Sequence, residues 1–137
     1  MAVGIGDVKD CFHRLIIPME LARYFCFEGV RAGELGMEGL TIDGQYLHYD
    51  NIIHPCPKTL PMGFSWALYL CQCATSSKLS KNVDSSLFRP ISDRSAPLVL
   101  GMRYVGRVGG YYVYVDNLGF ISLCRASVVS ALETAVF

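Results

Sequence analysis

The chain has 137 residues, of which 52% are hydrophobic and 18% charged, and 12 basic and 12 acidic side chains give a formal net charge of zero. Because disordered chains combine low hydrophobicity with high net charge, this composition excludes a disordered protein. It also excludes a basic nucleic-acid-binding tail and a polybasic membrane patch, which need an excess of Lys and Arg. The length allows either one domain with its own core or part of a larger domain. The high hydrophobic content and zero net charge favour part of a larger protein.

Short strands are predicted in the first sixty residues, where apolar or alternating runs are separated by Gly and Pro. Residues 11–17 predict a strand and turn or a short helix, ended by Pro18. The predicted strand segments are residues 3–5, which lead into Asp7, residues 23–28, and the neighbouring runs 46–49 and 52–53.

A long helix is predicted over residues 66–81, with Ser65 as its N-cap and Asn82 at its end. This stretch belongs to the longest apolar run of the chain, which polar residues and glycine interrupt. The run is shorter than the ~18 apolar residues that a membrane span needs, so we expect a buried helix and no membrane partner. The residues expected to face the core are Trp66, Leu70, Cys73 and Ala74.

The last third predicts a β-hairpin between a loop and a helix. Its strands cover residues 111–115 and 118–123, and Asp116-Asn117 forms a two-residue turn, because both residue types tolerate positive φ. The flanking segments are a loop over residues 83–97, a strand over 98–105, a turn over 106–110 and an amphipathic helix over 127–137. Together these elements predict an α+β fold, an antiparallel sheet with helices packed on one face, as a single partial domain over residues 1–137.

The six cysteines form no C-x-x-C pair and lie in apolar segments. We therefore expect small, buried, unpaired thiols in a reducing compartment. No secretory signal precedes Asp7, which also favours an intracellular protein, in the cytoplasm or nucleus. A zinc site formed by the three histidines and Cys56 is disfavoured, because the spacing matches no zinc pattern.

Two acids at strand ends are the first candidates for chemistry. Asp7 ends an apolar strand and Asp116 lies at the tip of the hairpin, so they meet only if the two strands are neighbours in one sheet. Paired carboxylates suit Mg²⁺, and two such ions stabilise the attacking and leaving oxygens of phosphoryl transfer. Taken singly, each acid is equally compatible with ordinary turn or helix-cap chemistry.

Three segments, in this order along the chain, resemble catalytic motifs of retroelement reverse transcriptases. Residues 7–12 (DVKDCF) resemble the first motif, an Asp followed by an aromatic residue five positions later. Residues 60–65 (LPMGFS) resemble the Leu-Pro-x-Gly-Phe turn that leads into a helix, and residues 114–117 (YVDN) resemble the Tyr-x-Asp-Asp hairpin. The resemblance implies the ferredoxin-like palm subdomain of an RNA-directed DNA polymerase, a nucleotidyltransferase.

The resemblance also implies residue roles. Asp7, Asp116 and Asn117 would occupy the catalytic positions, with the two aspartates binding Mg²⁺ or Mn²⁺. Residues expected to line the nucleotide pocket are Phe12, Pro61, Met62, Gly63 and Tyr114. A nucleic acid template-primer and deoxynucleotides would be the partners.

Departures from the family pattern weaken the expected activity. Asn117 replaces the second hairpin acid and removes one negative charge near the metal, and Met62 replaces the usual Gln. The fingers, the thumb and any RNase H domain fall outside these motifs, and would be lost or supplied by another chain. We therefore expect weak or no polymerase activity from this fragment, with a non-enzymatic α+β retroelement remnant, acting as an interaction module, as the alternative. Exposed apolar patches and aggregation are also expected.

Overall fold

The computed structural model describes residues 1–100 and 109–135, and the chain divides into two compact units. The first unit comprises Met1–Cys11 and Gly63–Phe137, and the second comprises Phe12–Met62. Among the helices described in these ranges, none is long and apolar enough to cross a bilayer.

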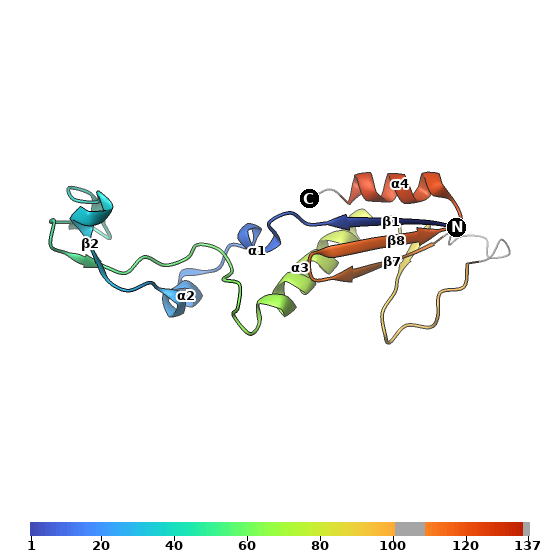
Figure 1. Cartoon of the computed structure of the whole chain (residues 1–137), viewed down its shortest axis with the longest axis horizontal. Helices are drawn as coiled ribbons and strands as arrows, with labels where there is room; N and C mark the ends of the chain where they lie inside the picture. The colour runs from blue at the N-terminus through green and yellow to red at the C-terminus, as the bar shows by residue number, and fades with distance from the viewer. Residues whose placement is uncertain (101–108, 136–137) are drawn as a thin grey trace. The chain divides into compact units, whose positions relative to one another are not determined.

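The first unit is an α+β structure on a four-stranded sheet with the order β1-β8-β7-β6. Its strands are β1 (Ala2–Asp7), β6 (Phe88–Pro90), β7 (Gly109–Tyr114) and β8 (Asn117–Ser122). β8 pairs antiparallel with both β1 and β7, and Figure 1 shows β1, β8 and β7 side by side. β6 pairs parallel with β7. The sheet is therefore mixed, and the prediction of a purely antiparallel sheet is wrong.

The parallel strand arises from the segment predicted as a loop. Residues 83–97 were expected to lack regular structure, but β6 lies within them. Parallel neighbours need a connection of a dozen residues or more, and residues 91–108 provide that length before β7 begins. The strand predicted over residues 98–105 is not present at residues 98–100, and its remainder lies outside the described residues. The turn predicted over 106–110 is likewise described only at its last two residues, which belong to β7.

Helix α4 (Arg125–Thr134) packs on β1 and β8, and Figure 1 shows it running along β1. The contact is close, because a Cβ atom added at Gly4 would lie 2.5 Å from Leu132 Cδ1 and 2.6 Å from Val128 Cγ1. Only glycine permits this approach without a shift of the Leu132 and Val128 side chains. The helix predicted over residues 127–137 is confirmed but begins earlier, and its last two residues lie outside the described range.

The residues that share a face with Gly4 form the core of the sheet. Gly4 lies opposite Phe120, which in turn lies opposite Tyr111. Phe120 is 1% exposed and packs edge-on against Phe88, with ring centroids 5.4 Å apart. A second aromatic contact, at 6.0 Å, joins Phe120 to Tyr111. The aromatic cluster therefore ties β6, β7 and β8 together on the side that α4 covers.

Helix α3 (Ala67–Asn82) confirms the predicted long helix, but its buried face is different. The buried residues follow a four-residue spacing: Ala67, Cys71, Thr75 and Leu79. Trp66 is 60% exposed, and Leu70 and Cys73 are exposed as well. The predicted core face is wrong because α3 carries apolar residues around most of its circumference, so periodicity alone does not select a face. Ser65 is not the N-cap either, since Trp66 takes that position without a side-chain capping bond.

The second unit consists of short elements. It contains two antiparallel strand pairs, β2 with β5 and β3 with β4. The predicted run 52–53 is confirmed by β5, whereas only Tyr46 of the run 46–49 belongs to a strand. Residues 23–28 form no strand, because the chain continues from α2 into a 3-10 helix and finds no strand partner. The elements are α1 (Cys11–Arg14), which begins at the boundary of the first unit, α2 (Met19–Ala22), η1 (Arg23–Phe25), β2 (Val30–Arg31), η2 (Ala32–Leu35), β3 (Thr41–Ile42), β4 (Gln45–Tyr46) and β5 (Ile52–Ile53).

Four of the six cysteines are paired. One disulfide joins Cys11 to Cys71 within the first unit, and another joins Cys26 to Cys56 within the second. The remaining thiols are exposed. The prediction of buried, unpaired thiols is therefore wrong, because spacing along the chain does not show which distant cysteines the fold brings together. Such disulfides persist in oxidising surroundings, and the intracellular location stays a prediction.

Candidate functional site

The candidate site lies where β1 and the β7–β8 hairpin end together. In the antiparallel pairing of β1 with β8, Asp7 lies directly opposite Asn117. Beyond this pair, the Val8 amide donates a hydrogen bond of 2.9 Å to the Asp116 carbonyl. The strands that carry the two acids are therefore neighbours, which is the condition that the sequence analysis set. Asp7 is exposed and Asp116 is half-buried.

The hairpin turn is displaced by one residue from the predicted position. β7 ends at Tyr114 and β8 begins at Asn117, so the turn consists of Val115 and Asp116. The prediction of an Asp116-Asn117 turn is wrong. The turn begins one residue earlier because Val115 adopts a left-handed backbone conformation, with φ 58°. A left-handed conformation costs a residue with a Cβ roughly 1–2 kcal/mol, so neighbouring contacts must hold it.

Gln72 provides those contacts, and the sequence analysis did not identify it. Its Oε1 accepts a hydrogen bond from the Val115 amide at 2.5 Å. Its Nε2 donates to the Val113 carbonyl at 3.0 Å and to Ser76 Oγ at 3.1 Å. One side chain on α3 thus anchors the strand and the turn that present Asp116. The available signal was a lone amide side chain within the apolar part of the helix.

The hairpin tip contains a hydrogen bond that bears on metal binding. Asn117 Nδ2 donates to Asp116 Oδ1 at 3.0 Å, so one carboxylate oxygen already has a partner. Two carboxylates and one amide oxygen are the ligands available at this edge. Within residues 1–100 and 109–135, no group of three or more His, Cys, Asp or Glu side chains forms a metal site. The arrangement offers hard oxygen ligands for Mg²⁺, with one charge fewer than three carboxylates would give.

The predicted nucleotide-pocket residues belong to both units. Tyr114, at the end of β7, is 72% exposed and lies two positions before Asp116. Gly63, which has φ 94°, belongs to the first unit and precedes α3. Phe12 and Pro61 are half-buried and Met62 is exposed, and all three belong to the second unit. Their assembly into one pocket stays a prediction.

The sheet face opposite the helices carries exposed apolar side chains. Val3 and Ile5 on β1 are 57% and 69% exposed, and Tyr112 and Tyr114 extend this face on β7. Because neighbouring residues of a strand point to opposite faces, these side chains lie on the side away from Gly4 and α4. The expected exposure of apolar patches is confirmed, and aggregation stays a prediction.

No family model matches the chain, and neither does any curated protein or solved structure.

Proposed function

We propose that the first unit is a polymerase palm, the catalytic layer of an RNA-directed DNA polymerase of the reverse transcriptase type. In this proposal Asp7 and Asp116 bind Mg²⁺ for nucleotidyl transfer to a primer 3′ end. The observation that carries it is the pairing of Asp7 with Asn117, which joins the ends of two motifs that lie far apart in the sequence. If the resemblance arose by chance, the first and third motifs would not be expected to lie next to each other in the fold.

The helix after the second motif supports the same interpretation. Residues 60–65 carry the Leu-Pro-x-Gly-Phe pattern, and α3 begins shortly after them. Through Gln72 this helix holds the turn of the third motif. The helix that follows the second motif therefore contacts the third motif, and an α+β sheet with helices packed against it is compatible with a ferredoxin-like palm.

The same geometry supports low activity. Asn117 replaces a carboxylate, and its amide group also bonds to Asp116. With a net charge of zero, the chain provides little attraction for template phosphates. The proposal therefore assigns much of the binding of template-primer and deoxynucleotides to fingers and thumb subdomains, which the three motifs do not include. An intracellular location belongs to this proposal as well.

Metal binding tests the proposal directly. We expect wild-type protein to bind Mn²⁺ weakly in calorimetry, and Asp7→Asn or Asp116→Asn to abolish the binding. Asn117→Asp restores a third charge a few ångströms from the ion and should tighten binding by about tenfold. Glu133→Gln is the matched control, because Glu133 is an exposed acid on α4. Mn²⁺ affinity that is the same in all variants would refute the site.

Primer extension on poly(rA)/oligo(dT) tests the catalytic step. Wild-type protein should extend the primer little, and Asn117→Asp should extend it more, because the third charge strengthens the metal site. Any extension should disappear in Asp7→Ala. Robust wild-type extension that depends on Asp7 would contradict the prediction of low activity while supporting the assigned residues.

The alternative is a non-enzymatic interaction module. The Asn117–Asp116 hydrogen bond favours it, because an acid that is bonded within the hairpin contributes to folding without a ligand. If Asn117→Asp binds no Mn²⁺, this alternative replaces the catalytic one.

A further inference from the structure

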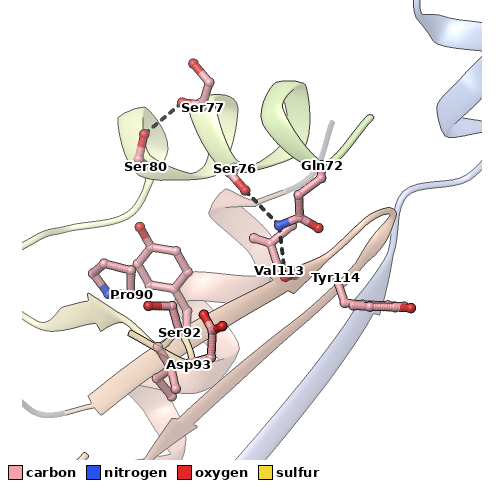
Figure 2. Close-up of a pocket in the computed structure, with 11 residues that line it drawn as sticks. Gln72, Ser76, Ser77, Ser80, Pro90, Ser92, Asp93, Val113 and Tyr114 are labelled. Carbon is pink, nitrogen blue, oxygen red and sulfur yellow. Dashed lines mark hydrogen bonds between the residues drawn. The ribbon is translucent and has the colours of Figure 1, made fainter. Parts of the chain in front are cut away.

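A pocket of about 620 Å³ opens on the first unit, between α3 and the sheet. Serines of α3 form one wall, and residues of β6, β7 and the segment after β6 form the other. Figure 2 shows Ser76, Ser77 and Ser80 on the helix, with Ser92 and Asp93 on the opposite side. The volume falls within the range of pockets that bind small organic molecules, roughly 300–1,000 Å³.

Tyr111 gives the pocket an unused hydrogen-bond donor. The residue is 8% exposed and lines the pocket from β7. Within residues 1–100 and 109–135, no residue forms a hydrogen bond with its hydroxyl. Burial raises the pKa of Tyr111, so the phenol stays neutral and keeps its proton. A buried polar group of this kind favours a ligand that supplies an acceptor.

Charge limits the class of ligand. Among the lining residues that the structure describes, Asp93 is the only formally charged one, and none is Lys or Arg. Figure 2 shows the Asp93 carboxylate directed toward the α3 side of the pocket. Within the described ranges Asp93 forms no ion pair. A phosphate or carboxylate ligand would meet a like charge here, whereas a cation would gain a charge-assisted hydrogen bond.

The remaining wall is apolar. Pro90, Ile91 and Val113 line the pocket beside the Tyr111 ring. A flat or cyclic ligand body would bury apolar area against these side chains, while the serine hydroxyls could bond to its polar substituents. We therefore expect a compact ligand with a ring, which packs on the apolar wall, and a positive charge, which the carboxylate attracts. The buried phenol would bond to a polar group of the same ligand.

We propose that this pocket binds a small organic cation, a ring compound of about the size of tyramine that carries a primary amine. The ring lies against the Pro90–Val113 wall, the ammonium group bonds to Asp93, and Tyr111 donates to an acceptor on the ligand. The proposal does not require the strand-end acids: Gln72 and Tyr114 line the pocket, but Asp7 and Asp116 do not.

Tyramine and 3-(4-hydroxyphenyl)propionate are the probes, because they share a phenol ring and carry opposite charges. We expect tyramine to bind saturably with a Kd of about 5 mM or lower, as titrated by protein NMR. The propionate should bind at least about tenfold more weakly, because it lacks the charge-assisted bond to Asp93. Shifts should be confined to amides of residues 72–80, 90–93 and 111–114. No saturable tyramine binding, or equal binding of both compounds, would overturn the proposal.

Two variants assign the contacts. Asp93→Asn should weaken tyramine about tenfold and abolish the preference for the cation, and Tyr111→Phe should weaken both probes several-fold. Glu133→Gln should bind tyramine as wild type does. Asp93 is exposed, so its variant is expected to fold normally, which keeps the test decisive even if Tyr111→Phe is unstable. Unchanged tyramine affinity in Asp93→Asn would refute the assigned cation site.

Discussion

Replacing Gln72 by Leu should loosen the hairpin tip that carries Asp116. Leu has a similar volume and a good helix propensity, so the substitution removes hydrogen bonds with little change to α3 itself. Three bonds are lost, those to the Val115 amide, the Val113 carbonyl and the Ser76 hydroxyl. At about 0.5–1.5 kcal/mol each, and with water reaching part of this region, we expect a loss of about 2 kcal/mol in the free energy of unfolding.

Two measurements check this expectation. Thermal unfolding followed by circular dichroism should show the melting temperature of the first unit falling by about 6–10 °C, given the scaling for a chain of this size. Hydrogen exchange should show the Val115 amide exchanging about tenfold faster, because its acceptor is gone. Ser77→Ala is the matched control, because Ser77 is exposed on the same helix and Ser80 Oγ donates to its backbone carbonyl, which the substitution keeps.

A Val115 amide that exchanges equally fast in the wild type and in Gln72→Leu would refute the argument that Gln72 holds the turn. The metal assay adds a functional readout. If Gln72 positions Asp116, the variant should weaken Mn²⁺ binding even under conditions where it is fully folded.

The cysteines give two further predictions. In unreduced, denatured protein only Cys73 and Cys124 should react with a thiol reagent, and reduction of the two disulfides should expose four more thiols. Reduction should also lower the free energy of unfolding by about 2–4 kcal/mol per bridge. Six reactive thiols before reduction would exclude the disulfides. Hydrogen bonding from Ser127 lowers the pKa of Cys124, so its thiolate fraction at pH 7–8 is raised and alkylation by iodoacetamide should be faster than in Ser127→Ala. Equal alkylation rates in the two proteins would contradict this.

The aggregation expected from the sequence has a structural counterpart in the open sheet face. An exposed apolar strand such as β1, with Ile5 69% exposed at the edge of the sheet, is a site for association with other chains. That face would be covered in a larger assembly, which is compatible with the interpretation of this chain as one part of a polymerase.

Local pattern alone was sufficient for the elements that depend on contiguous residues. The strand before Asp7, the hairpin after Tyr111 and the long helix up to Asn82 follow from apolar runs, turn residues and helical periodicity, which act over a few positions. The adjacency of Asp7 and Asp116 could be stated from the sequence only as a condition, and the β1–β8 register meets it.

Tertiary structure decided the features that depend on distant residues. The buried face of α3 is set by the sheet beneath it and not by the weak periodicity of its own sequence. The turn register depends on Gln72, which holds Val115 in a conformation that a β-branched residue does not adopt by preference. The parallel strand β6 and the two disulfides likewise join segments that no short-range pattern connects. At these positions, burial and hydrogen bonding across the fold together contribute more free energy than local propensity, because each contribution alone is of similar size to the propensity that it opposes.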